Sequence, residues 1–128
     1  MLISTESLKK NINDKCILKD ASFTIEDTDK IALIGVNGTG KSTLLKILAG
    51  IENYDSGIII KKNGIKIHYL PQNPEFKTDC VWDEIQLVNS KNENPVAEFE
   101  LKSILTKLGI TDYQSAMSNM SGGQRKRV

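Results

Sequence analysis

The chain has 128 residues, of which 39% are hydrophobic and 26% are charged, and its formal net charge is +1. This length suits one globular domain, and the near-neutral charge argues against a protein that binds nucleic acid by general electrostatic attraction. Because no apolar run reaches the roughly 20 residues of a membrane-spanning helix, and no charged-then-apolar signal sequence opens the chain, we expect a cytoplasmic protein.

The first 34 residues predict strands. Residues 1–30 are typical of a small antiparallel sheet with polar turns at residues 11–15 and 26–29. Residues 31–34 read Ile-Ala-Leu-Ile, a short apolar run that favours a strand buried on both faces.

A phosphate-binding motif follows this run. Residues 35–42 read Gly-Val-Asn-Gly-Thr-Gly-Lys-Ser and fit the pattern G-x-x-x-x-G-K-[ST] at every fixed position. Residues 42–49 are rich in Leu, Ile and Ala and stop at Gly50, so we expect a helix there. A glycine-rich turn with a solvated lysine is the structural alternative, and a strand and a helix on either side argue against it.

The residue types in this loop suit a nucleoside triphosphate with Mg²⁺. Lys41 is expected to reach the β- and γ-phosphates, the Ser42 hydroxyl to bind Mg²⁺, and Thr43 to assist at the α-phosphate. The other residues predicted to bind nucleotide are Gly35, Asn37, Gly38, Thr39 and Gly40, whose backbone amides can turn toward phosphate oxygens. Because kinases, GTPases and many ATPases share such a loop, it indicates a ligand and not a function.

Beyond the helix, short strands and then helices are predicted. We expect a turn at residues 55–57, strands near residues 58–60 and 65–69 separated by Asn63-Gly64, and a loop from Pro71.

Two helices should follow, over residues 81–88 and from Asn94-Pro95 to Gly109. On the second helix, one face is apolar and is expected to lie in the core; it comprises Leu101, Ile104, Leu105 and Leu108.

A second motif lies near the end of the chain. Residues 120–124 read Met-Ser-Gly-Gly-Gln, which resembles the Leu-Ser-Gly-Gly-Gln signature of ABC ATPases. A serine hydroxyl and glycine amides at a helix start form an anion-binding surface, although a bare Ser-Gly-Gly is more often a flexible turn. In this family the fold is α/β, a P-loop NTPase (RecA-like) core with an amino-terminal antiparallel β subdomain and an α-helical subdomain.

The resemblance implies further site residues. Ser121, Gly122, Gly123 and Gln124 would face the γ-phosphate held by a second ABC domain in a head-to-tail sandwich. Gln72 resembles the Q-loop glutamine, which helps to ligate Mg²⁺ and senses the γ-phosphate, and is therefore expected to be catalytic together with Lys41. Ile12 falls near the position of the aromatic residue that stacks on adenine in the family, so the preference for ATP over GTP is left open.

The resemblance also implies a partial domain. In the family the Mg²⁺-anchoring acid, the catalytic glutamate and the switch histidine lie beyond the position of Val128, so we expect this piece to bind ATP and the parent protein to hydrolyse it. The implied parts are residues 1–30 (antiparallel β), 31–72 (P-loop core and Q-loop), 73–120 (helical subdomain) and 121–128 (signature), with the carboxyl-terminal part of the core missing.

Three functions remain open. Residues 69–76 and 121–128 look most like the ABC-F group, ATPases that act on the ribosome; the alternative is the ATPase subunit of a membrane transporter, and an unrelated kinase or GTPase is disfavoured by the signature. The basic run Arg125-Lys126-Arg127 could contact ribosomal RNA, but a solvated helix face or a dimer seam is the better interpretation.

Overall fold

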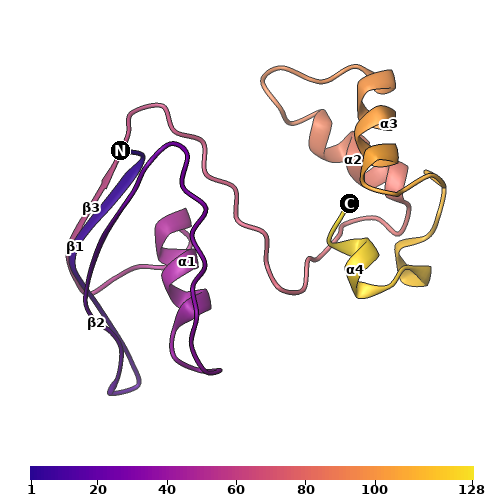
Figure 1. Ribbon diagram of the computed structural model, residues 1–128. Helices are drawn as coiled ribbons and strands as arrows, with labels where there is room; N and C mark the ends of the chain where they lie inside the picture. The colour runs from indigo at the N-terminus through magenta and orange to yellow at the C-terminus, as the bar shows by residue number, and fades with distance from the viewer. The chain divides into compact units, whose positions relative to one another are not determined.

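The computed structural model describes all 128 residues and divides them into two compact units, Met1–Tyr69 and Leu70–Val128. The first unit contains the strands and the first helix, and the second contains the remaining helices (Figure 1). Each unit has a hydrophobic core of its own. No helix in the chain is long and apolar enough to cross a bilayer.

The first unit is built on a three-stranded antiparallel sheet. Strands β1 (Ile3–Ile12) and β2 (Lys15–Ile25) form a hairpin, and β3 (Ser56–Lys61) pairs with the other edge of β1, giving the order β2-β1-β3. The hairpin turns at Asn13 and Asp14, with φ of 47° and 63°, a left-handed conformation that these two residue types tolerate well. The predicted amino-terminal sheet and the strand near residues 58–60 are therefore confirmed.

Helix α1 (Lys41–Ala49) lies against this sheet. It ends at Gly50, whose φ of 78° allows the amide to close the last turn on the Ile47 carbonyl. The buried side chains of the helix, Leu44, Ile47 and Leu48, follow the spacing of one helical face and pack against Ile3, Leu8 and Leu18 of the sheet. Burial of each such side chain contributes about 1.5–3 kcal/mol, so the sheet holds the helix and the loop before it in place.

The strand predicted at residues 31–34 is wrong. This segment makes no backbone hydrogen bond and is exposed, with Ile31 at 61% and Ile34 at 92%. An apolar run becomes a buried parallel strand only when neighbouring strands supply hydrogen-bond partners on both sides. In this structure no strand lies beside the run, so its composition alone does not make it a strand.

The strand predicted at residues 65–69 is also wrong. After the turn at Asn63-Gly64, these residues pair with no other strand, although Ile65 and Ile67 still pack against the core and His68 remains exposed. The alternation in the sequence therefore describes which side chains face the core, and the hydrogen-bonded ladder that defines a strand is absent.

The second unit consists of short helices. They are α2 (Val81–Asn89), α3 (Glu98–Lys107), the 3₁₀ helix η1 (Met117–Asn119) and α4 (Gly122–Arg125). The buried core consists of Val81, Leu105, Ile110 and Met117. The helix predicted at residues 81–88 is thus confirmed.

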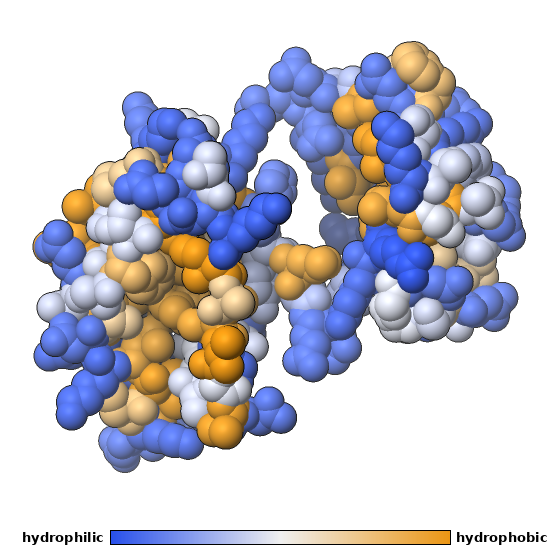
Figure 2. Space-filling model, in the orientation of Figure 1, coloured by the Kyte–Doolittle hydropathy of each residue, from blue (hydrophilic) through white to orange (hydrophobic).

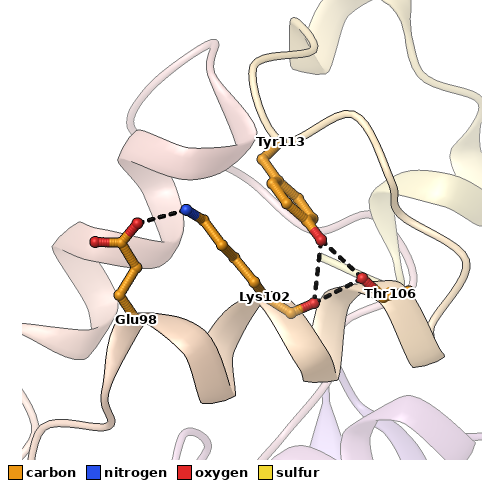
Figure 3. A network of polar contacts seen from close by, with 4 residues as sticks. All are labelled: Glu98, Lys102, Thr106 and Tyr113. Carbon is orange, nitrogen blue, oxygen red and sulfur yellow. Dashed lines mark hydrogen bonds and ion pairs between the residues drawn. The ribbon is translucent and has the colours of Figure 1, made fainter.

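A polar network attaches α3 to the segment that follows it (Figure 3). The Tyr113 hydroxyl lies 2.7 Å from the Thr106 hydroxyl and 3.3 Å from the Lys102 carbonyl, to which it donates. The Lys102 ammonium pairs with Glu98 and lies 5.1 Å from the centre of the Trp82 ring on α2. Because Lys102 belongs to α3 and its ammonium lies over a ring of α2, its side chain helps to fix the packing of these two helices.

Helix α3 begins later than predicted. Its N-cap is Ala97 and not Asn94-Pro95, because the Asn89 side chain binds both the amide and the carbonyl of Val96, at 2.8 and 2.9 Å, and holds that residue in the connecting loop. The predicted apolar face of this helix is only partly buried: Leu105 is 2% exposed, whereas Ile104 and Leu108 are 49% and 41% exposed.

Candidate nucleotide-binding site

The loop before α1 depends on glycine at two positions. Gly38 and Gly40 have φ of 82° and 95°, which other residues rarely adopt. Gly40 is also the N-cap of α1, and a Cβ atom there would lie 2.2 Å from Cγ2 of Ile17 on β2. The loop therefore reaches the helix by passing directly against the second strand of the hairpin.

The amino end of α1 presents unpaired hydrogen-bond donors. None of the backbone amides of residues 38–43 donates a hydrogen bond within the chain, and the first one that does is that of Leu44, to the Gly40 carbonyl at 2.9 Å. No side chain caps this end of the helix. Residues 35–39 are exposed, so the amides and the positive end of the helix dipole are accessible to an anion from solvent.

Lys41 lies over the loop. Its ammonium donates to the carbonyls of Gly35 and Val36, at 2.6 and 2.7 Å, and the Thr39 hydroxyl donates to the same Val36 carbonyl at 2.7 Å. These contacts hold a positive charge beside the unpaired amides. A depression of about 330 Å³ adjoins this arrangement; it is lined by Leu18, Leu33, Ile34, Gly35, Thr39, Gly40, Lys41 and Leu44.

Ser42 has a side chain that makes no hydrogen bond within the chain. It lies in the first turn of α1 and is exposed. A hydroxyl in this place can ligate a hard cation that arrives with phosphate oxygens. Thr43 is half-buried beside it.

The remaining predicted site residues belong to the second unit. Gln72 lies in an exposed bend, and Ser121 is the N-cap of α4. Ser121 and Gln124 form a capping box: the Ser121 Oγ atom accepts from the Gln124 amide at 3.2 Å, and the Ser121 amide donates to Gln124 Oε1 at 2.8 Å. Because α4 begins directly after Ser121, the predicted helix start at the Ser-Gly-Gly motif is confirmed. Gly122 and Gly123 are exposed, and their amides make no hydrogen bond within the chain.

Two of the three basic residues at the end of the chain are engaged within the second unit. Arg125 donates to the carbonyls of Met117 and Ser118, at 2.9 and 3.4 Å, and Arg127 donates to that of Leu108 at 3.3 Å. Lys126 and Arg127 are exposed, so the prediction of a solvated helix face or a dimer seam stays a prediction, while the two arginines also attach η1 and the end of α3 to this helix.

The comparison with known families agrees with these two motifs. The family model described as ABC transporter matches residues 18–128, which include the phosphate loop and the Ser-Gly-Gly-Gln segment. The chain belongs to the ABC transporter family. It is a segment of an ABC ATPase domain, and ABC ATPases bind ATP with Mg²⁺, hydrolyse ATP and dimerise, while those of transporters also pair with transporter subunits.

Relatives of this ABC segment include proteins of different kinds. It is 31% identical to the uncharacterized ABC transporter ATP-binding protein YfmR of Bacillus subtilis, 37% to the ATP-binding protein Uup of Buchnera aphidicola, and 36% to the zinc import ATP-binding protein ZnuC of Acinetobacter baylyi. Each match covers 99% of this chain but only 26%, 22% and 48% of the relative. The chain therefore spans half or less of the length of these relatives.

Solved ABC structures show the same fold. An ABC transporter ATP-binding protein from Pyrococcus furiosus matches with a TM-score of 0.84 and 26% identity, over 99% of this chain and 66% of that one. The structure thus has the ABC ATPase P-loop fold, comprising about half of the full domain, with the antiparallel β subdomain and helices expected from the sequence.

Ile17 of the β1–β2 hairpin contacts the ABC phosphate loop at Gly40, whereas Ile12 belongs to the end of the hairpin. Ile12 lies at the end of the hairpin, pairs with Lys15 and is 40% exposed. Ile17, which contacts Gly40, was not predicted from the sequence, because nothing in a strand residue indicates which loop it will meet.

Proposed function

We propose that residues 35–43 hold the triphosphate of Mg²⁺-ATP. The observation that carries this proposal is the set of unpaired, accessible amides at residues 38–43 beside the Lys41 ammonium. Phosphate oxygens would accept hydrogen bonds from these amides and from the Lys41 ammonium. Lys41 would then leave the Gly35 and Val36 carbonyls, because a charged phosphate oxygen is the stronger acceptor.

The metal would arrive with the nucleotide. No group of three or more acidic, histidine or cysteine side chains in the chain could hold a metal ion by itself. Mg²⁺ is commonly bound through substrate phosphates, water and one or two protein oxygens, which fits the free Ser42 hydroxyl and, by resemblance, the exposed Gln72 amide. Bound there, Mg²⁺ would neutralise phosphate charge.

A second ABC domain would complete the site. In this proposal, Ser121, Gly122, Gly123 and Gln124 meet the γ-phosphate held by the loop of a partner domain in a head-to-tail sandwich. The exposed, unpaired amides of Gly122 and Gly123 support this role. The capping box supports it as well, because it fixes the orientation of the turn.

We infer that the full-length protein is an ABC-F ATPase that acts on the ribosome. The resemblance of residues 69–76 and 121–128 to that group supports this assignment, as do the matches to YfmR and Uup. The match to ZnuC favours the second candidate, the ATPase subunit of a membrane transporter. Ribosome co-sedimentation of the full-length protein with a non-hydrolysable ATP analogue tests the choice: ABC-F function requires nucleotide-dependent pelleting, and its absence favours the transporter.

Calorimetric titration tests the nucleotide site itself. Lys41→Ala should abolish Mg²⁺-ATP binding or weaken it by at least about tenfold, since each charge-assisted bond contributes about 1.5–3 kcal/mol. Lys46→Ala removes a charge from the last turn of the same helix and should leave affinity unchanged. Equal affinity in the wild type and Lys41→Ala would refute the site.

A further inference from the structure

Two asparagines of the chain are followed directly by glycine, at Asn37-Gly38 and at Asn63-Gly64, and the first pair lies in the phosphate loop. We propose that Asn37 deamidates spontaneously in the nucleotide-free chain, that the modified loop no longer binds triphosphate, and that a bound triphosphate prevents the reaction. The reaction itself depends on local structure alone. Its consequence and its prevention rest on the proposed triphosphate site at residues 35–43.

The local structure at Asn37 favours deamidation. The reaction begins when the backbone nitrogen of the following residue loses its proton and attacks the side-chain amide carbon of the asparagine. Asn37 and Gly38 are exposed, and neither the Asn37 side chain nor the Gly38 amide makes a hydrogen bond within the chain. No atom lies within 4 Å of the position that a Cβ atom would take on Gly38. Nothing therefore shields the amide proton or obstructs the approach of the two groups.

The atoms of the reaction balance with water as the only other reactant. A bond forms between the Gly38 nitrogen and the Asn37 Cγ atom, and the bond from Cγ to Nδ2 breaks. Ammonia leaves, taking up a proton in place of the one that the Gly38 nitrogen lost. Water then opens the resulting succinimide ring. Attack at Cγ gives aspartate, whereas attack at the backbone carbonyl carbon gives isoaspartate, in which the main chain runs through the former side chain.

Either product should disable the proposed phosphate site. Each places a carboxylate in a loop that is proposed to receive phosphate oxygens, and like charges repel. Isoaspartate also lengthens the main chain by a carbon atom just before Gly38. The unpaired amides of residues 38–43 beside the Lys41 ammonium are the groups that carry the proposed site. A longer main chain would change the directions of the first of these amides.

A bound triphosphate should protect Asn37. A phosphate oxygen that accepts a hydrogen bond from the Gly38 amide keeps the proton on that nitrogen. Only the ligand-free fraction of the chain can then react, and this fraction is about one-tenth when the ligand is present at about ten times its dissociation constant.

The second Asn-Gly pair provides an internal control. Asn63 and Gly64 are exposed, Gly64 has φ of 75°, and no atom lies within 4 Å of the position of its Cβ atom. These features match those of Asn37-Gly38, but the pair lies in the turn after β3 and has no part in the proposed site. We therefore expect Asn63 to react whether or not a triphosphate is bound.

Peptide mapping tests the reaction and its prevention. The 128-residue chain is incubated at mildly alkaline pH, with and without Mg²⁺ and a non-hydrolysable ATP analogue. Mass spectrometry should find Asn37 and Asn63 modified in the free chain. The analogue, at about ten times its dissociation constant, should slow the reaction at Asn37 about tenfold and leave that at Asn63 unchanged. An intact Asn37 beside a modified Asn63, or equal modification of Asn37 with and without bound analogue, would overturn the proposal.

Calorimetric titration of the same samples measures the consequence. The number of Mg²⁺-ATP sites per chain should fall in proportion to the fraction modified at Asn37. Asn37→Gln should keep its own initial number of sites during the incubation, because glutamine would have to close a larger ring, which forms more slowly. Asn63→Gln should lose sites as the wild type does. A full number of sites in chains modified at Asn37, or equal losses in Asn37→Gln and the wild type, would refute the inactivation.

The proposed function fails in a different way. If the freshly prepared chain binds no Mg²⁺-ATP, or if Lys41→Ala binds it normally, the triphosphate site is refuted together with the protection and the inactivation. Peptide mapping of the free chain still shows whether Asn37 reacts. Binding by the fresh chain that is lost in Lys41→Ala, together with an intact Asn37 after incubation, would retain the triphosphate site and refute only the deamidation.

Discussion

At Gly40 a side chain would meet two obstacles. The backbone has φ of 95°, and the space where a Cβ atom would lie is occupied by Ile17. Gly38 has a similar φ of 82°, but no atom lies within 4 Å of its Cβ position. The two glycines therefore separate the cost of the backbone conformation from the cost of a steric clash.

Alanine substitution should reveal this difference. Gly38→Ala should destabilise the chain by about 1 kcal/mol, because alanine would have to adopt a backbone with positive φ, and no steric clash adds to this cost. Gly40→Ala should cost more and should also weaken Mg²⁺-ATP binding, because the loop must move away from Ile17. Thermal unfolding and calorimetric titration of both variants check this; equal effects would show that the contact with Ile17 is unimportant.

Glu84 is a buried residue whose carboxylate accepts hydrogen bonds from the segment before α2. It is 8% exposed, and its Oε2 atom accepts from the amides of Lys77 and Thr78, both at 2.9 Å, and from the Thr78 hydroxyl at 3.1 Å. A single carboxylate oxygen thus holds the segment before α2 against that helix.

Removal of this acceptor should destabilise the second unit. We expect Glu84→Ala to lower the free energy of unfolding by about 1–3 kcal/mol, because two partly buried backbone amides lose their acceptor. Glu84→Gln keeps an acceptor oxygen and should lose less, and exposed Asp83 provides the control variant Asp83→Ala. Chemical denaturation followed by the fluorescence of Trp82 measures the difference; equal stability of the Glu84→Ala and Asp83→Ala variants would contradict the assignment.

At the scale of the elements, α3 shows how packing selects among apolar residues. Leu105 and Ile104 are adjacent on the predicted apolar face, yet Leu105 is 2% exposed and Ile104 is 49% exposed. The Tyr113 hydroxyl bonds to Lys102 and Thr106 along one side of this helix (Figure 3). The helix therefore contacts the unit through a narrow stripe centred on Leu105.

Substitutions on α3 should follow exposure and not sequence pattern. Leu105→Ala should cost about 2–5 kcal/mol because it leaves a cavity in the core, whereas Ile104→Ala should cost less than about 1 kcal/mol. Denaturant midpoints of the two variants test this. Similar losses would mean that both residues lie in the core, as the sequence pattern predicts.

At the scale of the whole chain, apolar side chains remain exposed in the first unit. A groove of about 560 Å³ lies between β2, the extended segment at residues 31–33 and α1, with Phe23, Ile31, Leu33, Leu45 and Leu48 in its lining. In Figure 2 the face of this unit turned toward the viewer carries an apolar area between polar margins. Exposed apolar area of this kind binds apolar molecules and favours association.

A polarity-sensitive fluorescent dye should therefore bind to the isolated chain. Leu33→Ser, within the groove, should reduce dye fluorescence, and Ile34→Ser, which is outside the groove although its side chain is 92% exposed, should not. If both substitutions lower the signal equally, the dye reports scattered apolar residues and not the groove.

The features that the sequence determined by itself depend on neighbours along the chain. The Gly-Thr-Gly-Lys-Ser loop, the stop of α1 at Gly50, the turn before β2 and the capping box of Ser121 and Gln124 each arise from backbone angles and hydrogen bonds within a few residues. Such preferences are local, so the residue types are sufficient to predict them.

Tertiary structure alone decided the features that need a partner distant in sequence. Residues 31–34 are apolar enough for a buried strand but have no strand beside them. Asn89 binds the backbone of Val96, and α3 therefore begins after that residue. Ile17 packs against Gly40 of the phosphate loop. Strand pairing and side-chain packing are set by which surfaces meet in space, and one segment of sequence does not contain that information.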